Sequence, residues 1–328
     1  MKKTLITGGA GFIGYHLTKY FSKLNYKVDL VDNFSRGVED IHLKKLLNEN
    51  IKIINIDLLS SDINYIEKKD YDYIYHLAAI IGVNFVLKNP YRVLENNFKL
   101  LNNIIKFSQK QKNLNRFVFF STSEVYASSL RNYGIDFPTP ENTKLCADDL
   151  DDPRNSYALS KIYGESLCLH SDLPTTIIRP HNFYGPRMGM SHVIPELIKK
   201  IYFNDKESMK INSGDHSRTF LYISDAVKIL TDLVKSDLSV GKSFNIGDES
   251  HELKIIDLAE IIAKNLKKEI TFFCDKGINN SPSRRCPSMK NVYQIIQQNQ
   301  LVDINDGVQK CFKWYLENVF NSSEDNAI

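Results

Sequence analysis

The feature that most constrains this chain is a glycine-rich segment, Gly8 to Gly14, which stands between a strand pattern and a helix pattern. The strand pattern covers Thr4 to Thr7, and the helix pattern covers Phe12 to Leu24. In this context glycines permit a tight turn, let the backbone approach a pyrophosphate at Gly11, and allow close helix packing at Gly14. The segment predicts a dinucleotide site at a helix N-terminus. A glycine-rich turn without a ligand is the alternative interpretation.

The rest of the first half alternates short apolar runs with helix patterns. Strands are expected at Lys27 to Val31, Ile51 to Ile56, Tyr73 to Leu77, Arg116 to Ser121 and, later, Thr175 to Arg179. Val93 to Gln109 has apolar residues at helical spacing, and Pro90 stands where that helix would begin. Because strands that alternate with helices form parallel βαβ units, the pattern predicts an α/β fold with a doubly wound parallel sheet, the Rossmann fold.

Beyond Pro180 the segments are shorter and mixed, with several prolines as breakers. This pattern predicts a smaller, mixed α/β lobe that binds the substrate. Thr219 to Leu233 has the pattern of a strand and a helix that return to the main domain. We therefore expect a nucleotide-binding domain at residues 1–180, rejoined by about 219–262, and a second lobe at 181–218 and 263–328.

Composition limits the classes of partner. The 42 Lys and Arg against 39 Asp and Glu give a formal net charge of +3, which favours neither nucleic acid nor an anionic membrane. No run of about 18 apolar residues marks a membrane span. The five cysteines are scattered and form no Cys-x-x-Cys pair of the zinc type. We expect no metal, and a reducing cytoplasm as the location.

An acidic residue predicts the choice of nucleotide. Asp32 ends the second strand 24 residues after Gly8. A carboxylate there accepts hydrogen bonds from the adenosine ribose and repels a 2′-phosphate, which favours NAD over NADP. Asp32 can instead be only a turn residue, and the nearby Arg36 keeps NADP possible. Asp57 can reach the adenine or be a turn residue. The expected cofactor contacts here are Gly8, Gly11, Phe12, Ile13, Asp32, Asn33, Arg36, Asp57 and Leu58.

A tyrosine and a lysine form a candidate catalytic pair. Tyr157 and Lys161 are four residues apart and therefore share one helix face. Oxidation of a carbinol needs a base for the hydroxyl proton, and a tyrosine with the ordinary pKa of about 10 is mostly protonated at neutral pH. We expect the Lys161 ammonium, together with a nicotinamide cation, to lower the pKa of Tyr157, which then acts as base. The same spacing is also common on solvated helix faces.

A second segment supports the catalytic interpretation. Ser121 to Tyr126 follows the fifth strand at its C-terminal end, where doubly wound folds bind their ligands. Thr122 in that segment can hydrogen-bond the reacting oxygen. Leu130 to Asn155, rich in breakers and acids, is expected to be an irregular loop before the helix of Tyr157.

With these motifs the chain resembles the extended short-chain dehydrogenase/reductase family, in its nucleotide-sugar epimerase/dehydratase branch. The resemblance covers nearly the whole chain and is carried by Thr7–Gly14, His76–Ala79, Ser121–Tyr126, Tyr157–Lys161 and Arg179–Pro186. It implies an NAD-dependent enzyme that binds a nucleotide-diphosphate sugar and oxidises the sugar at C4 to a 4-keto intermediate. It also implies a homodimer that forms through two helices, here Val93 to Gln109 and Ser156 to Cys168.

The resemblance assigns roles to individual residues. The implied catalytic residues are Tyr157, Lys161 and Thr122, with Ser123 and Glu124 in the same segment. Further cofactor contacts are expected at Leu77, Ala78 and Ala79, and Asn97 is expected in the supporting network. The implied substrate residues are Asn182 and the arginines Arg187, Arg218 and Arg285. Asn182, Arg218 and Arg285 are expected to contact the diphosphate, since a guanidinium fork matches phosphate oxygens.

Three reactions can follow oxidation at C4: return of hydride to the opposite face, elimination of the C6 hydroxyl, or loss of a C6 carboxylate. The resemblance relates Glu124 to 4,6-dehydratases and UDP-glucuronate decarboxylases, and a carboxylate is a suitable base for C5. Gly185 to Met188 is similar to decarboxylases, while Thr122 to Glu124 is also similar to GDP-mannose 4,6-dehydratases. Ser123 replaces the aspartate of dTDP-glucose dehydratases.

Lyase chemistry is therefore the expectation, and 4-epimerisation is the alternative. Glu124 can also be a structural acid bonded to loop backbone. A dehydrogenase that releases NADH and a non-catalytic NAD-binding regulator are more remote alternatives.

Overall fold

The computed structural model describes residues 1–60, 66, 70–275 and 282–321. Its main domain contains a seven-stranded parallel sheet in the order β3-β2-β1-β4-β5-β6-β11. The strands are β1 (Lys3–Thr7), β2 (Lys27–Asp32), β3 (Ile51–Asn55), β4 (Tyr73–His76), β5 (Arg116–Phe120), β6 (Thr175–Pro180) and β11 (Lys242–Ile246). The predicted doubly wound sheet is confirmed, and six of these strands lie within one residue of their predicted bounds.

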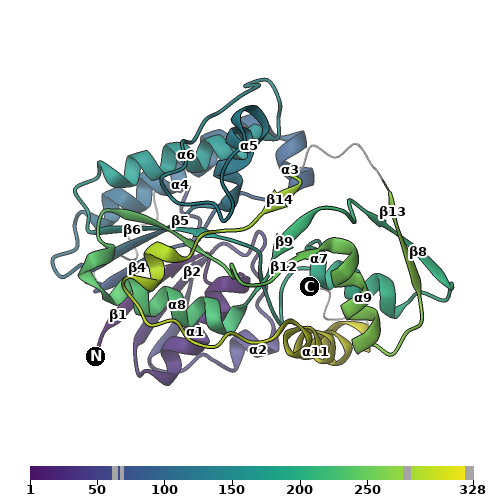
Figure 1. The fold of residues 1–328 in the computed structure, drawn as a ribbon. Coiled ribbons are helices and arrows are strands. Elements are labelled where there is room, and N and C mark those ends of the chain that lie inside the picture. Colours follow the sequence, from purple (N-terminus) through teal and green to yellow (C-terminus); the bar gives the residue numbers. More distant parts are fainter. Residues whose placement is uncertain (61–65, 67–69, 276–281, 322–328) are drawn as a thin grey trace.

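Helices cover both faces of the sheet (Figure 1). On one face, α1 (Phe12–Lys23) packs beside α8 (Ile223–Lys235). On the other face, α4 (Pro90–Ser108) packs beside α6 (Asn155–Leu169). The strand order changes direction between β1 and β4, so the carboxyl ends of the strands leave a crevice there, where open α/β sheets bind ligands.

The second lobe is built from α7 (Val193–Tyr202), α9 (Ile255–Asn265) and α11 (Ile304–Tyr315), together with the parallel strands β8 (Ser208–Asn212) and β13 (Thr271–Asp275). Residues 276–281 and 322–328 of the expected lobe lie outside the described residues. Although α9 falls largely within the segment expected to rejoin the main domain, it packs against α7 and α11. Its apolar face, which includes Leu258 and Ile262, is buried in that lobe. The segment that returns to the sheet ends with β11.

Short strands connect the two parts of the molecule. β7 (Phe183–Tyr184) pairs with β10 (Leu221–Tyr222), and β9 (Ser217–Thr219) lies between β12 (Glu252–Lys254) and β14 (Arg284–Arg285). The remaining helices are α2 (Ile41–Lys44), α3 (Val83–Lys88), α5 (Ala127–Tyr133) and α10 (Lys290–Tyr293). After α5, the stretch expected to be irregular contains no helix or strand until α6 begins. Among the described residues, no helix has both the length and the apolar character that a membrane crossing requires.

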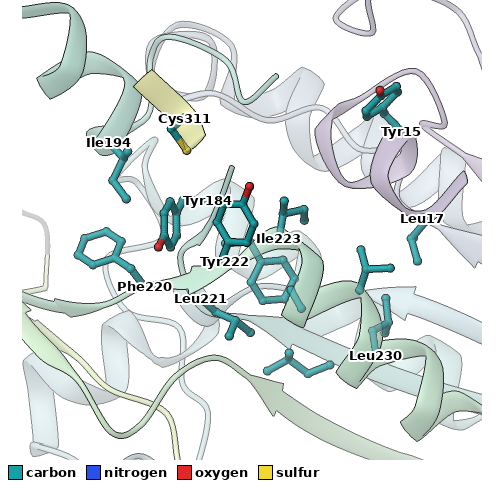
Figure 2. Packing of buried hydrophobic residues seen from close by; sticks show 14 of the residues in the cluster. Tyr15, Leu17, Tyr184, Ile194, Phe220, Leu221, Tyr222, Ile223, Leu230 and Cys311 are labelled. Carbon is teal, nitrogen blue, oxygen red and sulfur yellow. The ribbon is translucent and has the colours of Figure 1, made fainter. Parts of the chain in front are cut away.

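One apolar cluster continues from the main sheet into the second lobe. Figure 2 shows Leu17 of α1 and Leu230 of α8 at one end, and Ile194 of α7 and Cys311 of α11 at the other. Tyr184 of β7 is buried between these groups, at 1% exposure. The cluster therefore fixes the second lobe over the edge of the Rossmann domain, beside the crevice.

Candidate active site

A cavity of about 650 Å³ opens over the carboxyl ends of β1, β4 and β5. This volume is typical of small-molecule and cofactor sites, which span about 300–1,000 Å³. Most residues predicted for the site line this cavity: Gly8, Gly11, Phe12, Ile13, Asp32, Asn33, Arg36, Asp57, Leu58, Leu77, Ala78, Ala79, Thr122, Ser123, Glu124, Tyr157, Lys161, Asn182, Arg187 and Arg285. The fold therefore brings both predicted halves of the site, cofactor and catalytic, into one space.

The glycine-rich loop forms a tight cradle after β1. Gly8 has a φ of +68°, and a Cβ added there would lie 2.8 Å from the amide nitrogen of Ala78. A Cβ on Gly14 would lie 2.7 Å from the carbonyl oxygen of Gly8. Only glycine fits these positions, and the loop delivers the N-terminus of α1 to the cavity, as a pyrophosphate requires. The cradle thus fits NAD.

The conformation of this loop leads to a prediction about Gly8→Ala. The substitution should lower the melting temperature and abolish measurable NAD binding, because the new methyl group would meet the backbone of Ala78. Gly241→Ala is the matched control, because Gly241 has a φ of +69° with open space around it. That substitution should lower the free energy of unfolding by about 1–2 kcal/mol, the cost of a left-handed backbone conformation for alanine. Calorimetric titration with NAD and thermal unfolding measure both effects. If both variants lost NAD binding and stability to the same extent, the proposed role of Gly8 in the cradle would be wrong.

Asp32 joins the first two loops of the sheet. One carboxylate oxygen accepts the Ala10 N–H at 3.0 Å, and the other accepts the Phe34 N–H at 2.9 Å. Burial raises the pKa of this carboxyl, although both N–H groups act in the opposite direction. Asp32 therefore holds the glycine-rich loop against the end of β2, at the place expected for the adenosine ribose.

Two predicted residues lie around this loop in supporting positions. Asn97 on α4 does not line the cavity; its side chain bonds the N–H and the carbonyl of Ile80 at 2.7 and 3.1 Å. Arg187, expected at the substrate, forms a buried ion pair with Asp40 at 2.6 Å and donates to the carbonyl of Ala10 at 3.0 Å. The Arg187 guanidinium thus lies against the glycine-rich loop.

The catalytic pair lies on the cavity side of α6. The Lys161 ammonium is buried and donates to the carbonyl of Phe120 at 2.8 Å, at the end of β5. It lies 5.9 Å from the centre of the Tyr157 ring. The Tyr157 phenol shares a side-chain hydrogen bond with Thr122, whose oxygen also accepts the N–H of Glu124 at 3.2 Å. The three predicted catalytic groups therefore meet at one wall.

Burial dominates the electrostatics of Tyr157. Burial, followed by the Glu124 carboxylate, raises the pKa of Tyr157 above its usual value, while the bond to Thr122 and the charge of Arg36 lower it. Lys161 is not among the described groups that shift this pKa, so the lowering expected from Lys161 and the nicotinamide cation together stays a prediction. The Lys161 ammonium is bonded to a backbone carbonyl, and burial lowers its own pKa to about 8.

Positive charge gathers around Glu124. Arg285 on β14 donates to its carboxylate at 2.7 Å. Burial alone would raise the pKa of Glu124, but three guanidinium groups hold it below its usual value. They belong to Arg285, Arg154 and Arg218. Glu124 is therefore an ionised member of a cationic cluster.

The other substrate residues lie near this cluster. Arg218 does not line the cavity. Its guanidinium donates to the carbonyls of Ser217 and Pro282 at 2.7 and 2.6 Å. Burial, followed by the charge of Arg285, lowers the pKa of Arg218 to about 9. The Asn182 amide donates to the carbonyl of Thr219 at 2.9 Å.

Sequence reasoning missed Arg154. It stands three residues before Tyr157, on the same helix face, and that spacing is the signal that could have identified it.

Potential metal ligands are scattered across the described ranges. No three His, Cys, Asp or Glu side chains gather there in a group that could hold a metal ion. The side chains that gather at the catalytic wall are a tyrosine, a lysine, a threonine and several charged groups.

The comparisons with known proteins agree with this geometry. The model of the NAD dependent epimerase/dehydratase family matches residues 4–247. UDP-N-acetyl-alpha-D-glucosaminuronate decarboxylase from Bacillus cytotoxicus is 31% identical over 96% of this chain and 98% of its own. UDP-glucuronic acid decarboxylase 1 from Xenopus tropicalis is 27% identical over 100% of this chain and 75% of its own.

A solved structure gives the same result. UDP-glucuronic acid 4-epimerase from Bacillus cereus, in complex with UDP-glucuronic acid and NAD, superimposes with a TM-score of 0.79. It is 26% identical, over 96% of this chain and 99% of that chain. The resemblance seen in the motifs is thereby confirmed, and NAD is the cofactor. The chain belongs to the NAD-dependent epimerase/dehydratase family and is an enzyme that modifies nucleotide sugars.

Proposed function

We propose that the chain decarboxylates a UDP-linked hexuronic acid through a 4-keto intermediate. The observation that carries the proposal is the pair of Glu124 and Arg285, which faces the catalytic wall with Arg154 and Arg218 nearby. Three guanidinium groups around one carboxylate leave an excess of positive charge. Such an excess fits a substrate that carries both a diphosphate and a carboxylate.

In the proposed mechanism, Tyr157 removes the proton from the C4 hydroxyl while Thr122 holds the same oxygen by a hydrogen bond. NAD, held by the glycine-rich loop and Asp32, would supply the acceptor for the hydride from C4, and its positive charge would favour the phenolate. The Lys161 ammonium adds positive charge behind the phenol. The substrate is then a β-keto acid: its C5–C6 bond breaks, carbon dioxide leaves, and the electron pair passes to the C4 oxygen. Water then gives a proton to C5, and Tyr157 returns its proton to the C4 oxygen as the reduced cofactor would give the hydride back to C4.

Decarboxylation needs fewer catalytic groups in this site than dehydration does. Elimination of a C6 hydroxyl needs a base at C5 and an acid that protonates the departing oxygen. Ser123 stands where an acid would be needed, and its hydroxyl is a poor proton donor. Loss of a carboxylate needs neither group, but it needs a cation that holds the anionic substrate, which Arg285 supplies. The two decarboxylase relatives support the same choice.

The proposal is tested by product mass. The protein, NAD and UDP-glucuronic acid are incubated, with UDP-N-acetylglucosaminuronic acid and UDP-glucose in parallel, and the products are measured by mass spectrometry. We expect loss of carbon dioxide from a uronic acid and no change in UDP-glucose. An isomer of unchanged mass would identify an epimerase, and loss of water from UDP-glucose would identify a dehydratase. Either result would overturn the proposal.

We also propose a homodimer formed by α4 and α6. Phe98 of α4 and Tyr163 of α6 are 39% and 48% exposed, and their rings lie 5.4 Å apart. Tyr91, at the start of α4, is 71% exposed. An aromatic surface of this kind is typical of a protein interface. Light scattering should give twice the chain mass of 37.7 kDa, and Phe98→Asp should halve it.

A further inference from the structure

A buried ion pair lies directly behind the catalytic pair. Glu165 stands one helical turn after Lys161 on α6, just as Lys161 stands one turn after Tyr157. Arg179 of β6 binds both oxygens of Glu165, through Nη2 at 2.6 Å and Nε at 2.9 Å. The two side chains are only 6% and 5% exposed. Although burial opposes it, Glu165 holds the pKa of Arg179 above its usual value. The pair is thus a bidentate salt bridge in the interior.

Hydrogen bonds extend the pair to the catalytic segment. The hydroxyl of Ser121, the residue before Thr122, donates to Glu165. Arg179 also donates through Nη1 to the Tyr126 hydroxyl at 2.6 Å, and that hydroxyl donates to Asn245 of β11 at 2.9 Å. Both ends of the segment from Ser121 to Tyr126 are therefore tied to the same two charges.

The surroundings of Lys161 show which group can balance its charge. On α6, the Tyr157 ring lies 5.9 Å from the ammonium, and Glu165 and Cys168, further along the same helix, act on the pKa of Lys161 in the direction that opposes burial. From β4 His76 faces it, and from β5 come the Phe119 ring, at 4.9 Å, and the carbonyl of Phe120.

Most of these groups are neutral near pH 8. Burial lowers the pKa of His76 to about 3, so its imidazole is neutral, and burial raises the pKa of Cys168 so that the thiol keeps its proton. The Tyr157 phenol is neutral until it gives up its proton. Among the described groups that act on the pKa of Lys161, Glu165 is then the fixed anion.

We propose that Glu165 is a positioning residue that keeps Lys161 protonated, and that Arg179 sets how much of the Glu165 charge Lys161 experiences. The proposal rests on the proposed role of Lys161 in oxidation at C4. Without a carboxylate, burial would remove the proton of Lys161, and a buried carboxylate without Arg179 would itself be costly to desolvate.

The test is the pH dependence of kcat/KM with UDP-glucuronic acid, measured as product formed. Since Lys161 must be protonated, activity should fall as the pH rises through its pKa of about 8. Glu165→Gln removes the anion, so the descending limb should move about one pH unit lower or more. Arg179→Gln leaves the anion uncompensated, so the limb should move higher by a similar amount.

Two further variants keep the test decisive. Arg179→Lys restores the cation and should return the limb toward that of the parent, and the double variant Glu165→Gln/Arg179→Gln should fall between the two single variants. Thermal unfolding and NAD content are measured for each variant. If a single variant does not fold, the pH profile of the double variant is compared with that of the parent instead. A purely structural role would reduce activity at every pH without these opposed shifts, and that result would overturn the inference.

Failure of the underlying mechanism is recognised separately. In Lys161→Arg the cation persists at all accessible pH values, so the descending limb should disappear. If the limb persists in Lys161→Arg, the role proposed for Lys161 is wrong. If the limb disappears there but does not move in Glu165→Gln and Arg179→Gln, only the inference about the ion pair is wrong.

Discussion

Replacement of Tyr157 by phenylalanine should lower turnover by about a thousandfold, the middle of the range for loss of a general base. The phenol lies in the cavity, bonded to Thr122, and in the proposed mechanism it takes the C4 hydroxyl proton. Phenylalanine keeps the ring and its packing, so melting temperature and bound NAD should remain at the parent's values. Turnover is measured as product from UDP-glucuronic acid, and the NAD content from the absorbance spectrum.

The control for this variant lies on the opposite side of the same helix. Tyr163 is 48% exposed and packs edge-on against Phe98, away from the cavity. Tyr163→Phe should therefore retain the parent's turnover. If Tyr157→Phe turned over as fast as Tyr163→Phe, the proton transfer would belong to another group, and the proposed mechanism would be wrong.

Arg285→Met should selectively weaken binding of substrates that carry a carboxylate. The variant removes the cation that we propose binds the C6 carboxylate and leaves Glu124, an anion, without its partner. Removal of one partner of a buried charge pair costs about 2–5 kcal/mol, so the Kd of UDP-glucuronic acid should rise about 30-fold or more. The Kd of UDP-glucose, which has no carboxylate, should change much less. Calorimetric titration of both nucleotide sugars gives the comparison.

The neighbouring residue provides the matched control. Arg284 pairs with Glu252 at 2.8 Å, lies over the Phe137 ring and is 47% exposed in its side chain. Arg284→Met removes the same charge one position away, and both Kd values should stay close to those of the parent. Equal weakening of UDP-glucuronic acid and UDP-glucose in Arg285→Met would assign Arg285 to the shared diphosphate, as its sequence motif first suggested.

The parts of the site that are local in sequence could be predicted from the sequence. Gly8, Gly11 and Asp32 follow adjacent parallel strands, and the carboxyl ends of such strands meet at one edge of a sheet. Tyr157 and Lys161 share a helix face by their spacing alone. Each of these positions depends on residues that lie close together in one short segment of the chain.

Contacts between distant segments could not be predicted in this way. Arg285 meets Glu124 across 161 residues of chain, and the contact depends on β14 pairing with β9. Arg187 meets Asp40 across 147 residues, which places it at the glycine-rich loop. The spacing of Tyr157 and Lys161 on a helix likewise does not reveal their burial or the bond of Lys161 to the carbonyl of Phe120.

The apolar cluster shared by the two lobes has a mechanical consequence. A hinge rotation of the second lobe would separate Tyr184 from Cys311 and expose their apolar surface to water. That exposure costs about 25 cal/mol of free energy per Å². The lobes should therefore behave as one rigid block, melt in a single transition, and fail to fold when expressed as separate fragments. Entry of a nucleotide sugar then depends on displacement of surface loops around the cavity.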